Sequence, residues 1–349
     1  MPNNTISPYA ALPLQVTCQA INQLPDRESA RRSMHDTVDR LHRQIRASKA
    51  FIGPHLRLVV LPEYFLTGFP MGDTLEGWQH KAALEIECDI YDKLARTAAD
   101  NRVYLSGNGY EVDPNFPSLY FQTSFIFSDT GEMILRYRRL ISMFAPTPHD
   151  VLDRYLDVYG ADSLFPVANT ELGRLACIAS EEILYPEIAR ALTLRGAEII
   201  CHSSSEIGSP APTPKNIAKS ARAYENHCYV VSANSAGITG TDMPAASADG
   251  GSRVVDFHGQ VIAQADTGES MAGYADLEIE QLRHYRRRPS MFNTLSRQRL
   301  ELFASLYGDN SVYPANTLLE NGEVRVPERS HFLQTQAAVI ERLTREGII

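Results

Sequence analysis

The sequence predicts an α/β fold with a mixed sheet, and two observations lead to this class. Short apolar runs typical of buried strands alternate with segments of helical periodicity, which favours parallel strands joined by helices. Two turn signals, at 129–131 and 258–259, each lie between two strand-like runs and predict hairpins. The sheet is therefore expected to contain both parallel and antiparallel pairs.

The N-terminal half is predicted to alternate strands and helices before a hairpin. Its predicted elements are strand 14–21, helix 26–49, strand 56–61, helix 75–101, strand 102–107 with a turn at 107–109, and hairpin strands 119–128 and 132–138. In segment 26–49, Ala30, Met34, Val38 and Leu41 recur at intervals of three or four residues, which is helical periodicity. Glu63 follows strand 56–61, at the carboxyl end where open α/β sheets bind ligands.

The C-terminal half repeats the pattern after an irregular segment. Its predicted elements are loop 142–160, strand 175–179, helix 186–195, strand 197–202, helix 215–226, strand 228–234, and hairpin strands 254–256 and 261–263. A loop as long as 142–160 is usually functional or lies in an interface. The turn at Ser180 joins a buried strand to a helix, and such an elbow lifts one side chain to the top of the sheet.

Composition limits the classes of function. Hydrophobic residues make up 44% of the 349 residues and charged residues 21%, as in ordinary globular domains. The net charge of −9, without a Lys/Arg run, argues against nucleic acid or an anionic membrane as a partner. We find neither an apolar membrane span nor a secretory signal. The polar, Arg-rich residues 286–349 are predicted to form a C-terminal extension of a domain at 1–285. The extension is expected to pack on that domain or across a subunit interface.

The cysteines predict reduced thiols. Five are scattered through the chain, an odd number without metal-site spacing: Cys18, Cys88, Cys177, Cys201 and Cys228. Most lie in apolar, strand-like runs, so we expect buried thiols in a cytoplasmic protein, with no metal and no other cofactor.

Three segments carry a resemblance to a known family. They are 61–70, which contains Glu63, then 137–139, which ends with Arg139, and 173–187, which contains Ser180. With the supporting segments 222–237 and 251–256, they resemble the nitrilase superfamily of carbon–nitrogen hydrolases over roughly residues 10–285. The resemblance implies an αββα four-layer sandwich, with two mixed sheets between helices, in a homodimer or larger assembly that acts on a small-molecule substrate.

The resemblance also implies the catalytic positions. The family uses a Glu as general base, a Lys that stabilises the oxyanion and a Cys nucleophile, and these positions are Glu63, Arg139 and Ser180 here. Ser180 lies seven residues after Gly173 and six before Pro186, as the family spacing requires. Two of the three identities therefore differ from the family. Cys177 lies at an odd offset along the same strand, so it is expected to face the other way as a core thiol.

These differences change the expected chemistry. A serine hydroxyl is far less acidic than a thiol and needs a positioned base, for which Glu63 is the candidate. Arg139 keeps the positive charge of lysine but offers a planar fork suited to a carboxylate. Three interpretations stay open: an engineered Cys-to-Ser inactive amidohydrolase, an enzyme acting on an amide, nitrile or carbamoyl C–N bond without a thiolate, and a pseudoenzyme or scaffold that binds a small molecule.

Four further residues are candidates for substrate binding or for supporting contacts. Tyr64 adjoins Glu63, and Glu182 matches an acidic position two residues after the family's nucleophile. Ser203 follows a strand end, where an ordinary serine-rich turn is an equal alternative. His149 lies in the loop where many family members place a second glutamate, although a plain loop residue is the alternative there.

Overall fold

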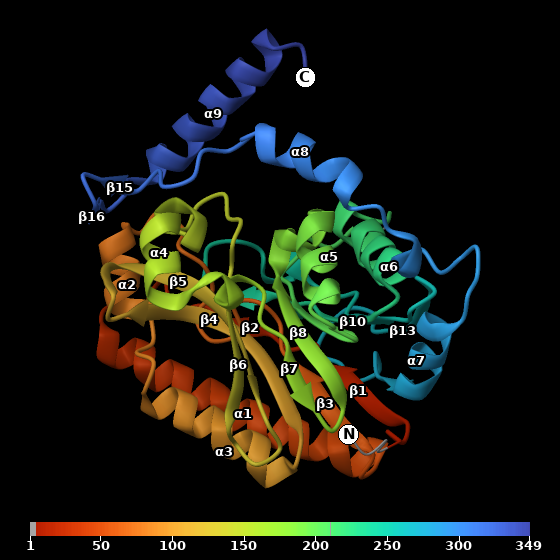
Figure 1. Ribbon diagram of the computed structural model, residues 1–349. Helices are drawn as coiled ribbons and strands as arrows, with labels where there is room; N and C mark the ends of the chain where they lie inside the picture. The colour runs from red at the N-terminus through yellow and green to blue at the C-terminus, as the bar shows by residue number, and fades with distance from the viewer. Residues whose placement is uncertain (1–4, 210) are drawn as a thin grey trace.

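A computed structural model, which describes residues 5–209 and 211–349, contains two six-stranded sheets packed face to face (Figure 1). The first sheet runs in the order β14 (Ala275–Leu277), β1 (Tyr9–Pro13), β3 (Leu56–Val60), β4 (Tyr104–Asp113), β5 (Phe116–Phe127), β6 (Met133–Arg138). The second runs β13 (Val261–Gln264), β12 (Arg253–Val255), β10 (Tyr229–Ala233), β9 (Ile199–Ser203), β8 (Gly173–Ala179), β7 (Ala168–Thr170). Each sheet has parallel central pairs and antiparallel outer pairs, so the predicted mixed sheet is confirmed.

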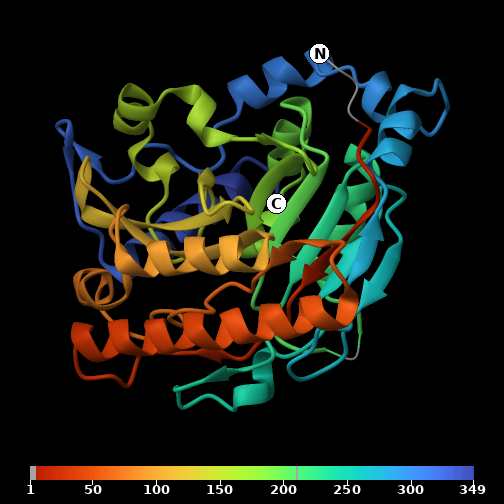
Figure 2. The ribbon, with the colours of Figure 1, turned by 90° about the horizontal axis from the view of Figure 1, so that it is seen from below.

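Helices cover the outer faces of both sheets and complete four αββα layers. Helices α1 (Arg27–Ile52) and α3 (Asp89–Asn101) lie side by side along the first sheet (Figure 2). Helices α5 (Pro186–Leu194) and α6 (Pro214–Asn226) cover the second sheet (Figure 1). Apolar side chains fill the three spaces between these layers. The residues that predicted α1 are buried, which explains why its helical stripe was visible in the sequence.

The remaining short elements connect or decorate this sandwich. They are β2 (Cys18–Gln19) paired with β11 (Ile238–Thr239), helix α2 (Leu75–Ala82), helix α7 (Ile279–Arg287) and the 3₁₀ turns η2 (Ala161–Leu164), η3 (Ser180–Leu184), η4 (Ala245–Ala248) and η5 (Leu295–Arg297). Among the residues that the structure describes, no helix has the length and apolar character needed to cross a bilayer.

Three predicted elements were wrong in detail. The predicted strand 14–21 contains only the two-residue β2, because the sheet strand β1 ends at Pro13, before the predicted strand begins. The predicted helix 75–101 is interrupted because Leu84 pairs with β4 through its backbone N–H and C=O. The predicted turn at 107–109 lies inside β4, where a Cβ on Gly107 would come within 2.7 Å of the Phe125 ring. Glycine is therefore used at this position for close packing rather than for a turn.

Segment 142–160 was predicted as a loop and is partly helical. It contains the 3₁₀ turn η1 (Pro148–Val151) and helix α4 (Leu152–Tyr159). Asp150 fixes the start of η1, because its carboxylate accepts hydrogen bonds from the backbone N–H and the hydroxyl of Thr147. The sequence prediction missed this local cap, which resembles a capping box.

Residues 286–349 contain helix α8 (Glu301–Asp309), a small hairpin of β15 (Leu319–Glu320) and β16 (Glu323–Val324), and helix α9 (Arg329–Arg345). Figure 1 shows α8 and α9 crossing above the sandwich, near α4 and α5. The start of the hairpin contacts segment 142–160, since the Thr317 hydroxyl donates to Asp150 at 2.7 Å. Leu318 is fully buried there in a cluster that includes Phe116, Phe121 and Tyr155.

Leu318→Ala should lower the free energy of unfolding by about 2–4 kcal/mol, because it leaves a cavity in this cluster. Urea unfolding followed by circular dichroism measures the loss. Leu333→Ala on α9 is the control, because Leu333 is 45% exposed and its truncation should cost less than about 0.5 kcal/mol. Equal effects of the two variants would show that the hairpin does not dock through Leu318.

Candidate active site

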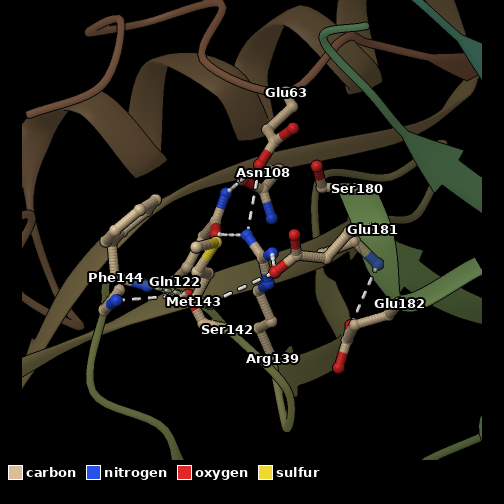
Figure 3. Close-up of polar contacts among 12 residues, drawn as sticks. Glu63, Asn108, Gln122, Arg139, Ser142, Met143, Phe144, Ser180, Glu181 and Glu182 are labelled. Carbon is tan, nitrogen blue, oxygen red and sulfur yellow. Dashed lines mark hydrogen bonds and ion pairs between the residues drawn. The ribbon is translucent and has the colours of Figure 1, made fainter. Parts of the chain in front are cut away.

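The three positions that the family resemblance singled out come from the ends of three strands. Glu63 follows β3, Arg139 follows β6 and Ser180 follows β8. Strands β3 and β6 run in the same direction within the first sheet, so Glu63 and Arg139 lie at one edge of it. Figure 3 shows Arg139 between Glu63 and Glu181, with the Ser180 hydroxyl on the side where Glu63 lies.

Glu63 is a buried carboxylate with one bonded and one unbonded oxygen. Its Oε1 accepts hydrogen bonds from Gln122 Nε2 at 2.7 Å and from Arg139 Nη1 at 3.4 Å. Its Oε2 makes no hydrogen bond with any described residue, although the side chain is fully buried. A buried carboxylate oxygen without a partner is costly, so such an atom points to a role toward a ligand or a transferred proton.

Arg139 is the hub of a group that we call the Arg139 network: Glu63, Gln122, Arg139 and Glu181. Its Nη1 donates to Gln122 Oε1 as well as to Glu63, and its Nη2 donates to Glu181 Oε1 at 2.5 Å. Its Nε donates to the carbonyl oxygen of Ile141 at 2.7 Å. Burial opposes the charge of Arg139, but the carboxylates of Glu63 and Glu181 outweigh burial and raise its pKa further. The guanidinium is therefore a permanent cation whose three nitrogens all contact protein acceptors.

Ser180 lies at a strained elbow. Its φ is +50°, in the left-handed region that residues with a side chain rarely adopt. The backbone is held there by His202, whose Nε2 lies 2.8 Å from the Ser180 carbonyl oxygen. His202 is completely buried; burial first and the charge of Lys219 second lower its pKa far below the usual value, so the ring is neutral. The Ser180 hydroxyl accepts a hydrogen bond from Lys215 Nζ at 3.3 Å.

Glu182 ties the elbow to the chain that carries Arg139. Its Oε1 accepts hydrogen bonds from the Tyr137 hydroxyl at 2.8 Å and from the backbone N–H groups of Leu140 and Ile141. Its Oε2 accepts from the N–H of Ala179 at 3.2 Å. Burial raises the pKa of Glu182 to about 7, against the charge of Arg139 and these donors, which favour the carboxylate. Glu182 thus connects the Ser180 turn with the backbone at Leu140 and Ile141.

Of the other predicted residues, Tyr64 lies at the site, whereas the side chains of Ser203 and His149 face elsewhere. Burial and the neighbouring charge of Glu63 raise the pKa of Tyr64 well above its usual value, so its phenol is neutral. The Ser203 hydroxyl donates to the Leu61 carbonyl oxygen at 2.8 Å, which joins the two sheets. His149 faces Tyr313, with ring centres 6.3 Å apart, and makes no hydrogen bond with Glu63, Arg139 or Ser180.

Cys177 is a core thiol, as its strand position predicts. It is packed among the side chains between the two sheets, and its Sγ lies 3.7 Å from Ser106 Oγ. Burial raises the pKa of Cys177 to about 12. A thiol in this position is therefore not an available nucleophile.

Several residues that complete the site were not predicted from the sequence. Gln122 on β5 bridges Glu63 and Arg139, and its Nε2 also donates to Asn108 Oδ1 on β4 at 2.9 Å. A polar amide in the largely apolar run 119–127 was the one local signal for Gln122, and it does not show which residues Gln122 contacts. Lys215 had no such signal, because it is one charge in a polar segment. Among the described residues, no three His, Cys, Asp or Glu side chains are grouped so as to hold a metal ion.

Comparison with known proteins identifies the family. The carbon–nitrogen hydrolase family model matches residues 18–287, so the chain belongs to this family. It is 26% identical over 226 residues to the nitrilase and fragile histidine triad fusion protein NitFhit of Caenorhabditis elegans, covering 64% of this chain and about half, 49%, of that protein. It is also 26% identical over 248 residues to a deaminated glutathione amidase of Yersinia enterocolitica, covering 70% and 81% of the two chains.

A solved structure supports the fold. The crystal structure of Saccharomyces cerevisiae Nit3, a nitrilase-superfamily member, superposes with a TM-score of 0.61 at 20% identity. The match covers 80% of this chain and 93% of that one. The two-sheet sandwich between helices is therefore the nitrilase fold, as the resemblance implied.

Glu182→Met should lower the free energy of unfolding by about 3–5 kcal/mol. It keeps most of the side-chain volume but leaves a buried tyrosine hydroxyl and backbone N–H groups without their acceptor. Chemical denaturation measures the change, with Glu187→Met as control because Glu187 is exposed on the adjoining helix. A Glu182→Met variant as stable as the control would show that these hydrogen bonds to Glu182 do not stabilise the fold.

Proposed function

We propose that this protein hydrolyses the carbon–nitrogen bond of a small amide, with Ser180 as nucleophile and Glu63 as acid and base. The observation that carries the proposal is the buried, unbonded Oε2 of Glu63, located beside an elbow that presents a hydroxyl. Membership of the carbon–nitrogen hydrolase family supports the reaction class, and a matched relative is named as an amidase.

In the proposed reaction, Ser180 Oγ attacks the amide carbon while its proton passes to Glu63. The new O–C bond gives a tetrahedral intermediate whose carbonyl oxygen carries the negative charge. Glu63 then returns the proton to the nitrogen, the C–N bond breaks, and ammonia or an amine leaves. Glu63 then takes a proton from water, whose oxygen attacks the ester carbon; the bond between that carbon and Ser180 Oγ breaks, Glu63 returns the proton to Oγ, and a carboxylic acid leaves. Nitriles and carbamoyl compounds are related candidates, because they offer the same kind of electrophilic carbon next to nitrogen.

In this scheme Arg139 binds and positions Glu63 and does not bind a carboxylate of the substrate. Its nitrogens contact Glu63, Gln122, Glu181 and a backbone carbonyl, so its planar fork binds the protein's own carboxylates. The Arg139 cation lies 3.4 Å from Oε1 and helps to hold the carboxylate in place. Gln122 fixes the rotation of the carboxylate, which leaves Oε2 as the oxygen for proton transfer.

A non-catalytic binding protein is the second candidate. The observation that favours it is the full engagement of Arg139, because the family position that stabilises an oxyanion is here occupied by internal contacts. A pseudoenzyme of this kind would bind a small amide without releasing ammonia. Calorimetric binding in the absence of turnover would support this candidate over the first.

Ser180→Ala and Glu63→Gln should each reduce ammonia release from a panel of short aliphatic amides. We expect a loss of at least about 10³-fold in kcat for Ser180→Ala and about 10²–10⁴-fold for Glu63→Gln, because nucleophile and base are removed separately. A coupled assay for ammonia measures both. Cys177→Ala is the matched control, since its buried thiol takes no part in the scheme. Loss of turnover in Cys177→Ala, with Ser180→Ala unaffected, would show that the nucleophile is misassigned.

A further inference from the structure

Lys215 is a polar neighbour of Ser180 that the proposed reaction has not used. It lies on the first turn of α6, 35 residues after Ser180, and its Nζ is 3.3 Å from Ser180 Oγ. Helix α6 packs against both η3, which begins at Ser180, and β10, so the contact is anchored by the fold. The half-buried Lys215 side chain reaches a hydroxyl that is only 6% exposed.

Lys215 differs from Lys219, which lies one turn later on the same helix. Lys219 is buried and paired: its Nζ lies 3.3 Å from Glu206 Oε2 and 3.2 Å from Asn216 Oδ1. Lys215 makes no ion pair with any described Asp or Glu residue, and its hydrogen bond is to Ser180. The charge of Lys219 is therefore balanced by a structural partner, whereas the charge of Lys215 is directed at the hydroxyl.

We propose that Lys215 is a catalytic residue that activates Ser180 by stabilising the negative charge developing on Oγ during nucleophilic attack. The inference rests on the proposed function, in which Ser180 attacks an amide carbon. A serine at the family's cysteine position needs additional activation, because an alkoxide forms far less readily than a thiolate. Lys215 would supply that activation. A cation at hydrogen-bond distance in a site with little water lowers the energy of that alkoxide.

Lys215 and Glu63 have different roles in this proposal. Lys215 donates to Oγ and keeps its own proton, while the Ser180 proton passes to Glu63 and later to the leaving nitrogen. The His202 contact with the Ser180 carbonyl holds the elbow, and the hydroxyl it presents lies 3.3 Å from Lys215 Nζ.

Labelling with phenylmethylsulfonyl fluoride tests Lys215 without requiring an amide substrate. Ser180 Oγ attacks the sulfonyl sulfur, an O–S bond forms, fluoride leaves, and intact-mass spectrometry with peptide mapping follows the adduct. Lys215→Met should slow labelling of Ser180 by roughly 10- to 100-fold, the loss expected for a hydrogen bond to a charged group. Lys215→Arg, which keeps a cation, should restore the rate to within roughly 10-fold of the native protein.

Lys93→Met is the matched control, because it removes a partly buried lysine charge from α3, on the outer face of the other sheet. It should label at the native rate. Native-rate labelling of Lys215→Met, an equal slowing in Lys93→Met, or no labelling of native Ser180 would each overturn the inference. A change in KM for amides with kcat and labelling unchanged would also overturn it, since Lys215 would then bind substrate instead.

The same measurements separate this inference from the proposed function. Labelling that depends on Lys215 while no amide is hydrolysed would leave the activation intact and refute the hydrolase. Amide hydrolysis that requires Ser180 but not Lys215 would leave the hydrolase intact and refute the activation.

Discussion

The site depends on one buried ion-pair network centred on Arg139. Its guanidinium joins carboxylates from two separate segments, Glu63 after β3 and Glu181 after β8, and Gln122 holds the first of them in place. Removing one partner of a buried charge pair typically costs about 3–5 kcal/mol, because the remaining charge stays buried without compensation. The two sheets are therefore linked electrostatically at the edge where their strand ends meet, and the orientation of Glu63 follows from that link.

The fold supplies this network with rigid supports rather than flexible loops. Glu182 receives donors from the chain on both sides of Arg139, and His202 fixes the strained backbone at Ser180. Strain at a non-glycine residue persists only where the surroundings determine it, and here it presents the hydroxyl. Arg139 is committed to carboxylates, and Lys215 provides a second cation beside the hydroxyl.

Part of the fold and of the candidate site could be predicted from the sequence. Apolar periodicity predicted the alternating strands and helices, whereas the family resemblance implied the four layers and singled out Glu63, Arg139 and Ser180 as candidates. Gln122 and Lys215 could not be placed, because their roles depend on contacts between segments that no local pattern connects. Gly107 was misread as part of a turn because the sequence does not show the Phe125 ring packed against it. His149 was a positional guess, and the fold of segment 142–160 directs its ring toward Tyr313.

The most direct test of the account is to locate the acyl group during turnover. Butyramide hydrolysis would be stopped with acid at short times and the protein digested for peptide mass spectrometry. If Ser180 is the nucleophile, a butyryl ester forms on Ser180 in the native protein and is absent from Ser180→Ala. A butyryl group on Cys177 or on any other residue, or turnover without acylated protein at any time, would contradict it.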